Sequence, residues 1–198
     1  MPTQLAFYFE QKHCSGCSTC QIACKDKNNL PAGQLYRTVR EVAGGGYQQD
    51  GPAITHDVYA FWLSISCNHC AKPVCMEHCP SGAIVKQAEN GIVYINREQC
   101  SGCQACVRSC PYHAPQFDSK DRKVGKCDFC RDLLAEGRPP ACVAACPMRA
   151  LAFGPLAELR EKYGHVSSTI GLPAEELTCP SLVIAPHRDA IQKRCKQG

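Results

Sequence analysis

The spacing of its cysteines constrains the fold of this chain more than any other feature of the sequence. Eighteen of its 198 residues are cysteines, and sixteen of these fall into four groups of four. The first and third groups, CSGCSTCQIAC and CSGCQACVRSCP, both follow the spacing C-x2-C-x2-C-x3-C. The second group, CNHCAKPVCMEHCP, and the fourth, CDFC with the later CVAACP, widen one gap that a longer loop can absorb.

That spacing is the one with which bacterial ferredoxins hold iron–sulfur clusters. Three thiolates spaced by two residues let one loop wrap a cluster, whereas the fourth starts a helical turn and points to a neighbouring cluster. Proline (Pro80, Pro111, Pro147) follows the last cysteine of groups two, three and four and turns the chain off that helix, but group one has Lys25 there. Structural zinc sites prefer two separated cysteine pairs, so a zinc-binding interaction module is only a distant alternative.

Composition argues against several other classes. Cysteine-dense chains are usually small secreted disulfide scaffolds, but the N-terminal MPTQLAFYFEQKHC lacks the features of a signal peptide, so we expect thiolates. No apolar stretch approaches the ~18–20 residues that span a bilayer, so we expect no direct membrane span. With about −2 on each of four clusters, the net charge of +4 becomes about −4, and no nucleic-acid partner is expected.

The segments between the groups indicate how they pair. In residues 83–96, AIVKQAENGIVYIN, alternating apolar residues flank Asn90-Gly91. This pattern predicts a hairpin. Ferredoxin modules carry such a hairpin between their cluster loops. Groups two and three therefore form an inner module (67–114), and groups one and four pair as an outer module (1–34 and 115–160).

Two further segments complete the predicted architecture. Residues 35–66 form a β-rich insertion, with strands over 37–42 and 57–65 around a turn-rich loop, AGGGYQQDGP. After Cys146, a strand leads into a helix with Pro155 at its first position and Gly164 just past its end. The predicted fold class is α+β: two nested ferredoxin-like [4Fe–4S] modules, the insertion, and over 161–198 an extended C-terminal tail that contacts partner subunits.

Four segments carry a resemblance to a known family: SISCNHC (64–70), CPSGAI (79–84), CPYHAPQFD (110–118) and CPMRALAFGP (146–155). In them the chain resembles the iron–sulfur (B) subunits of dimethyl sulfoxide reductase, four-cluster ferredoxin-type subunits that serve molybdopterin oxidoreductases. The resemblance extends to about Pro155. It implies four clusters, and Cys103 stands where nitrate-reductase-type relatives have an aromatic residue beside a three-iron cluster, so all four should be [4Fe–4S].

The family pattern also assigns the ligands. Cluster 1 takes Cys14, Cys17, Cys20 and Cys146; cluster 2 takes Cys24, Cys127, Cys130 and Cys142; cluster 3 takes Cys67, Cys70, Cys75 and Cys110; cluster 4 takes Cys79, Cys100, Cys103 and Cys106.

The function that the resemblance implies is non-catalytic. Such a subunit relays single electrons from an integral membrane quinol-oxidising anchor subunit to a molybdopterin-containing catalytic subunit, here of the S- or N-oxide reductase type, in anaerobic respiration. The equivalent subunit of a formate dehydrogenase or hydrogenase is the alternative. We expect association with the inner membrane through these partners, at the periplasmic face by export with a signal-bearing partner, although the cytoplasmic face stays open.

Other residues near the ligands have plainer interpretations. Histidines beside cysteines are expected to be packed or solvated rather than ligands, because every group is already complete: His13, His69, His78 and His113. Basic residues near ligands either neutralise cluster charge or are solvated: Lys25, Lys27, Arg108 and Lys126. Cys179 and Cys195 lie outside all motifs and are expected to be free thiols.

Overall fold

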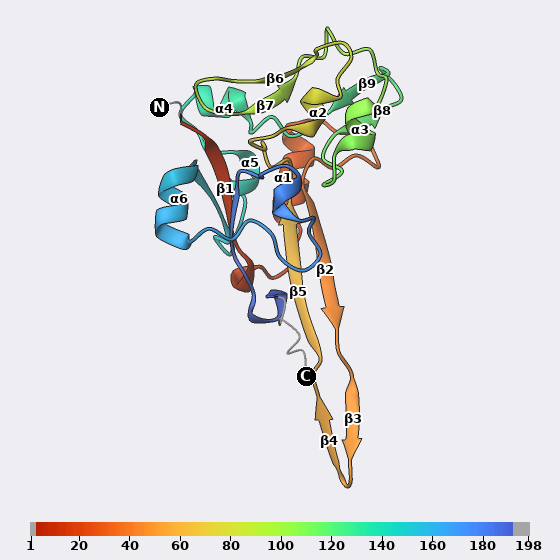
Figure 1. Ribbon diagram of the computed structural model, residues 1–198, viewed down its shortest axis with the longest axis vertical. Helices are drawn as coiled ribbons and strands as arrows, with labels where there is room; N and C mark the ends of the chain where they lie inside the picture. The colour runs from red at the N-terminus through yellow and green to blue at the C-terminus, as the bar shows by residue number, and fades with distance from the viewer. Residues whose placement is uncertain (1–2, 192–198) are drawn as a thin grey trace.

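Residues 3–191, the part of the chain that the computed structural model describes, form a mixture of short strands and helices (Figure 1). The strands are β1 (Leu5–Glu10), β2 (Thr38–Gly44), β3 (Tyr47–Asp50), β4 (Ala53–His56), β5 (Tyr59–Ile65), β6 (Ile84–Lys86), β7 (Val93–Ile95), β8 (Gln116–Asp118), β9 (Lys123–Gly125), β10 (Leu151–Pro155) and β11 (Leu182–Ala185). The helices are α1 (Thr19–Lys27), α2 (Val74–Glu77), α3 (Ala105–Ser109), α4 (Arg131–Ala135), α5 (Ala141–Ala144) and α6 (Leu156–Tyr163), with 3-10 helices η1 (Gln11–His13), η2 (Glu175–Leu177) and η3 (Arg188–Ala190). This mixture agrees with the predicted α+β class.

A three-stranded sheet, ordered β10-β1-β11, separates two layers of the core. Side chains of β1 alternate between its faces. Ala6 and Tyr8 pack towards α6, where the Tyr8 ring stacks on Tyr163 with centroids 3.8 Å apart. Phe7 and Phe9 face the larger core that contains many of the cysteines. The sheet therefore separates the cysteine-rich core from the α6 layer.

The segment predicted to be an extended tail completes this sheet. β11 pairs in parallel with β1, and Val183 and Ile184 are fully buried. The prediction of an extended tail is wrong for residues 182–185, because the apolar run SLVIAP pairs with an open edge of β1 and satisfies its hydrogen-bonding groups. The contact of this segment with partner subunits stays a prediction. Residues 192–198 lie outside the described part of the chain. The preceding helix α6 lies between Pro155 and Gly164, within one residue of the expected limits.

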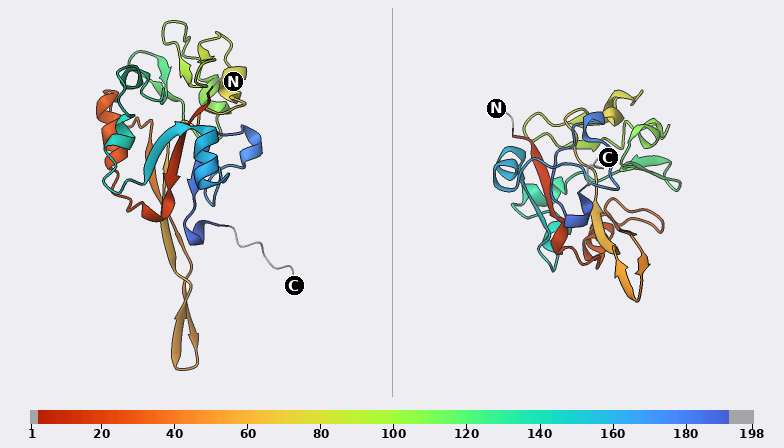
Figure 2. Two further views of the ribbon diagram at one scale, coloured as in Figure 1. Left: turned by 90° about the vertical axis from the view of Figure 1, so that its left-hand side faces the viewer. Right: turned by 60° about the horizontal axis from the view of Figure 1, so that its bottom comes forward.

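A two-stranded ribbon projects from the body in Figures 1 and 2. β2 and β5 form its base, and β3 and β4 continue it to a two-residue turn at Gly51 and Pro52. The turn-rich AGGGYQQDGP was expected to be a loop, but part of it forms β3, because this tight turn brings it back along β4. Every residue of β3 and β4 is exposed, whereas Leu63 and Ile65 at the base belong to the cysteine-rich core.

Two short hairpins lie near the other end of the molecule. β6 and β7 pair antiparallel from Ile84 opposite Ile95 to Lys86 opposite Val93, and Gly91 in their connection has φ +69°. This confirms the hairpin predicted from the Asn90-Gly91 signal. The second hairpin, β8–β9, was not predicted, because each of its strands has only three residues and little alternation.

Candidate metal centres

The first and third cysteine groups fold in the same way. In each, the glycine of CSGC has a left-handed conformation, with φ +71° at Gly16 and +72° at Gly102. A second left-handed residue, Ser18 or Gln104, then immediately precedes a short helix. These turns coil the chain tightly enough to bring successive cysteines to one side of the loop. The repeated sequence thus gives a repeated local structure.

The helix after each of these two loops is short where a proline follows the last cysteine and longer where none does. α3 stops at Ser109, directly before Cys110 and Pro111. α1 lacks the proline and runs for nine residues, so that Cys24 lies within the helix. Proline cannot continue an α-helix because it lacks the backbone N–H and its ring clashes with the preceding turn. The sequence difference at Lys25 therefore explains why α1 is longer.

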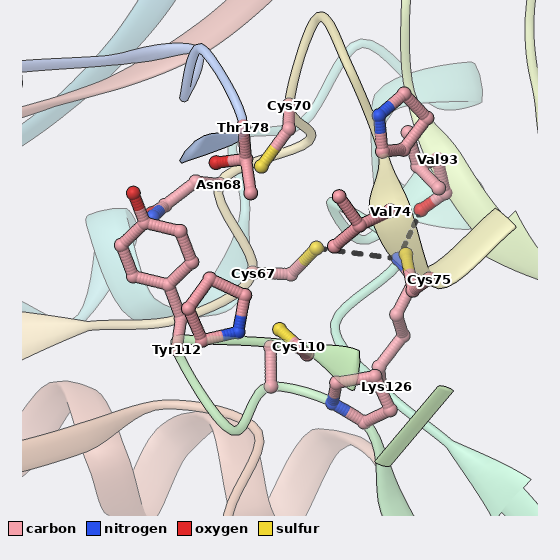
Figure 3. Close-up of a pocket in the computed structure, with 14 residues that line it drawn as sticks. Cys67, Asn68, Cys70, Val74, Cys75, Val93, Cys110, Tyr112, Lys126 and Thr178 are labelled. Carbon is pink, nitrogen blue, oxygen red and sulfur yellow. Dashed lines mark hydrogen bonds between the residues drawn. The ribbon is translucent and has the colours of Figure 1, made fainter. Parts of the chain in front are cut away.

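Three cavities in the described structure are each lined by four of the predicted cysteines. Each combines three cysteines from one group with one from the paired group. We call these cysteines the first set (Cys14, Cys17, Cys20, Cys146), the third set (Cys67, Cys70, Cys75, Cys110) and the fourth set (Cys79, Cys100, Cys103, Cys106). Figure 3 shows the third set, with the four sulfurs around the cavity and Tyr112, Thr178 and Lys126 at its margin.

The second set (Cys24, Cys127, Cys130, Cys142) is the most deeply buried. All four side chains are buried. Burial, together with the neighbouring Cys142 and Cys130, raises the pKa of the Cys24 thiol to about 12. Burial also raises the pKa of Cys127, and the thiols of Cys67, Cys24 and Cys142 act in the same direction. Helix α1, which carries Cys24, packs against α5, which carries Cys142. Lys126 contacts both the carbonyl of Cys127 and the sulfur of Cys67, so the second and third sets are neighbours.

The chemistry of these donors fits [4Fe–4S] clusters. Burial raises the pKa of Cys70 and of Cys75 to about 12, so thiols left alone there would be protonated at neutral pH. Coordination to a metal deprotonates thiols and removes that cost. All cysteines in the described part of the chain are free thiols, Cys179 among them. Over residues 3–191, no three His, Cys, Asp or Glu side chains come close enough to hold a single metal ion.

The histidines beside the ligands differ in their surroundings. His13, His78 and His113 are exposed. His69 is buried, its Nδ1 accepts a hydrogen bond from the Val93 N–H at 3.0 Å, and its Nε2 lies 3.8 Å from Cys127 Sγ. Burial, assisted by Lys126, holds the pKa of His69 well below its usual range. The hydrogen-bond network therefore assigns a neutral ring whose Nε2–H points at the Cys127 sulfur.

Among the basic residues singled out from the sequence, Lys126 alone contacts a ligand sulfur. Its Nζ lies 3.3 Å from Cys67 Sγ (Figure 3). Lys25 donates to backbone carbonyls, including that of Leu30 at 2.9 Å, Lys27 pairs with Asp132 at 2.7 Å, and Arg108 is exposed.

Sequence reasoning missed Arg37, which lies in the predicted strand RTVREV. Its guanidinium is buried, donates to Ser64 Oγ at 3.1 Å, and through that hydroxyl reaches Cys20 Sγ at 3.3 Å. Burial opposes its charge, but the nearby thiolates, with Cys142 and Cys20 first, outweigh burial and raise its pKa. An arginine in an amphipathic strand pattern gives no local signal of burial.

Comparisons with known proteins agree with the donor chemistry. Residues 58–156 match a protein family described as "4Fe-4S dicluster domain". The B subunit of anaerobic dimethyl sulfoxide reductase from Escherichia coli (strain K12) is 44% identical over 190 residues, 96% of this chain and 92% of the relative. Its counterpart in Haemophilus influenzae is 44% identical over 188 residues, 94% and 91% of the two chains. The thiosulfate reductase electron transfer subunit PhsB of Salmonella typhi is 38% identical over 159 residues, 80% and 79% of the two chains.

Proposed function

Since this protein belongs to the family of anaerobic dimethyl sulfoxide reductase B subunits, which are iron–sulfur electron-transfer proteins, we propose that it relays single electrons through four [4Fe–4S] clusters. The ligands would be the four thiol sets, each holding one cluster. The chain would work within a complex, between a membrane anchor subunit that oxidises quinol and a molybdopterin-containing catalytic subunit that reduces an S- or N-oxide.

The observation that carries this proposal is the serial order of the four sets. Helix α1 carries Cys20 of the first set and Cys24 of the second. Cys75 of the third set and Cys79 of the fourth lie on and just after α2. The second and third sets meet where Lys126 reaches both the sulfur of Cys67 and the carbonyl of Cys127. A continuous line from the first set to the fourth is what an electron relay needs.

The cysteines at the two ends of this line are more exposed than those of the second set, which supports entry and exit of electrons at the ends. Cys17 of the first set and Cys103 of the fourth are exposed, whereas all cysteines of the second set are buried. The proposal assigns the catalytic subunit to the first set and the quinol-oxidising anchor to the fourth. The second set is shielded from solvent, and in the third set Cys67 and Cys75 are buried while Cys70 and Cys110 are half-buried.

The role of the protein in this proposal is placement and tuning. When bound, [4Fe–4S] clusters supply one-electron carriers whose potentials depend on local charge, hydrogen bonds to sulfur and solvent exposure. The cysteines fix position, the apolar core around Phe7, Phe129 and Leu151 excludes water, and His69 points an N–H at a ligand sulfur. No substrate bond is made or broken on this chain.

Membrane attachment in the proposal comes from the partner subunits. No helix within residues 3–191 has the length and apolar character needed to cross a bilayer. We propose attachment at the periplasmic face of the inner membrane through the anchor subunit. Protease accessibility in intact spheroplasts tests this face, since only a periplasmic chain would be cleaved before lysis.

The relay is tested with the complex purified under anaerobic conditions. A quinol analogue should bleach the visible absorbance of the iron–sulfur clusters, and dimethyl sulfoxide should restore it. Cys103→Ser, at the exposed end of the fourth set, should slow bleaching by quinol while leaving reduction by dithionite intact. The proposal fails if quinol does not reduce the clusters, or if the catalytic and anchor subunits turn over equally fast without this chain.

A further inference from the structure

Two cationic side chains lie in the interior without a carboxylate partner. Arg37 is 2% exposed and Lys126 is 5% exposed. Neither belongs to any ion pair with Asp or Glu in residues 3–191. An unpaired buried charge is among the most costly features a protein can contain. Each of these cations therefore needs an anion that is not a carboxylate.

The Arg37 side chain lies between the first and second sets. Its Nη1 donates to the carbonyl and hydroxyl oxygens of Ser64, at 2.9 and 3.1 Å, and its Nη2 donates to Ser66 Oγ at 3.0 Å. Its Nε is buried without a hydrogen-bond partner. The same Ser64 hydroxyl lies 3.3 Å from Cys20 Sγ of the first set. The nearby Cys142 of the second set also favours the charged guanidinium and helps to raise the pKa of Arg37.

Lys126 occupies the equivalent place between the second and third sets. Its Nζ lies 3.3 Å from Cys67 Sγ of the third set and 3.0 Å from the carbonyl oxygen of Cys127, a member of the second. A further bond to the Val93 carbonyl fixes the ammonium there (Figure 3). The adjacent His69 ring is neutral and adds no charge of its own.

We propose that Arg37 and Lys126 are fixed counter-charges at the two successive junctions of the relay, and that each raises the reduction potentials of the two clusters beside it. The inference rests on the proposed function, because the anions are the clusters with their thiolates. A buried cation favours the more negative, reduced state of a nearby cluster, and the low dielectric of the interior strengthens the effect. The second cluster, flanked by both cations, receives both contributions.

This arrangement predicts a position-specific pattern of potentials. Lys126→Gln should lower the potentials of clusters 2 and 3 and leave clusters 1 and 4 nearly unchanged. Arg37→Gln should lower those of clusters 1 and 2 only. We expect at least a tenfold decrease in the equilibrium constant for one-electron reduction of each affected cluster, which corresponds to about 59 mV.

The experiment is a potentiometric titration of the complex followed by EPR. Each spectral component is first assigned from a ligand variant, one per cluster: Cys17→Ser, Cys130→Ser, Cys70→Ser and Cys103→Ser. Four reducible components in the unmodified chain establish the relay itself, independently of the cations. The charge variants are then titrated under the same conditions. Failure of the proposed function would thus appear in the unmodified chain, and failure of the present inference only in the variants.

Matched variants separate charge from shape and from mere proximity. Arg37→Lys and Lys126→Arg keep the charge and should retain potentials close to the original. Arg108→Gln removes an exposed cation between Cys106 and Cys110, where solvent screens it, and should shift no component. Unchanged potentials in both Gln variants, or an equal shift of all four components, would overturn the proposal.

Loss of iron in the Gln variants is also decisive. If the flanking clusters are lost from a Gln variant but retained in the corresponding charge-keeping variant, the counter-charge is required for binding and the proposal stands. If both kinds of variant lose the same clusters, packing rather than charge determines the result, and the proposal is wrong.

Discussion

At the scale of single residues, the candidate ligand cysteines could be predicted from the sequence. The buried charged and polar side chains around them could not. The C-x2-C pattern is local, so the grouping of cysteines could be predicted from the order of residues. The pairing of groups was predicted from the hairpin between groups two and three, which ferredoxin modules carry. The burial of Arg37 depends on how β2 packs against the core, which no local pattern encodes. Similarly, nothing in the sequence distinguished buried His69 from exposed His13 and His78.

The glycine of the first CSGC loop gives a prediction at this scale. Gly16 has φ +71°, and an added Cβ would lie 2.2 Å from Trp62 Nε1. Gly16→Ala should therefore lower stability by more than the ~1–2 kcal/mol of a left-handed residue alone, and should reduce iron bound at the first set. Thermal unfolding and iron analysis measure both effects.

Gly137→Ala is the matched control for that variant. Gly137 has φ +72°, but an added Cβ there would meet nothing within 4 Å. It should lose stability through backbone strain only and keep its full iron content. Equal losses in the two variants would mean that contact with Trp62 is unimportant.

At the scale of helices and strands, a prediction succeeded where the sequence pattern behind it lay within one short segment. The β6–β7 hairpin was predicted because alternation and an Asn-Gly turn lie within one short segment. The ribbon was predicted only in part, since β2 and β5 carry apolar residues but β3 and β4 are polar and exposed throughout.

The length of α1 gives a prediction for this scale. Lys25 lies inside the helix, at the position where the other three groups have proline after their last cysteine. Lys25→Pro should remove a helical hydrogen bond and cost about 3 kcal/mol, with loss of iron from the second set because Cys24 precedes it. Lys25→Ala, which removes only the bonds from Nζ to loop carbonyls, should keep the iron. Circular dichroism and iron analysis distinguish the two, and normal iron in Lys25→Pro would contradict the account.

The ribbon tip should be dispensable for folding. Gly46 and Asp57 are already joined by hydrogen bonds, from Gly46 N–H to Asp57 Oδ1 at 2.7 Å and from Asp57 N–H to the Gly46 carbonyl at 3.2 Å. Replacement of residues 47–56 by an Asn-Gly turn should leave iron content and thermal midpoint unchanged, because β3 and β4 are fully exposed. A fall in either quantity would mean that the tip supports the core.

At the scale of the whole molecule, the central sheet joins segments from both ends of the chain. β1 pairs with β10 and β11, which lie far away in sequence. Such long-range pairing cannot be predicted from periodicity, and this is why the last described segment was mistaken for a tail. The assignment of the four ligand sets stays a prediction, which the positions of the thiols support.

Ile184 tests the contribution of β11 to this sheet. It is fully buried in the cysteine-rich core, so Ile184→Ala should lower the free energy of unfolding by about 2–5 kcal/mol. Ile191→Ala, at a side chain 57% exposed, should change it by less than ~0.5 kcal/mol. Denaturant unfolding of the anaerobic protein measures both, and a small effect at Ile184 would mean that β11 adds little to the fold.

We propose that the four thiol sets hold four [4Fe–4S] clusters in series. This proposal is tested most directly by iron and zinc analysis of the anaerobically purified chain, combined with EPR during stepwise reduction. We expect about sixteen irons per chain, negligible zinc, and reduced signals broadened by coupling between neighbouring clusters. About four zinc ions without a reducible signal would contradict it and would make the chain a structural interaction module.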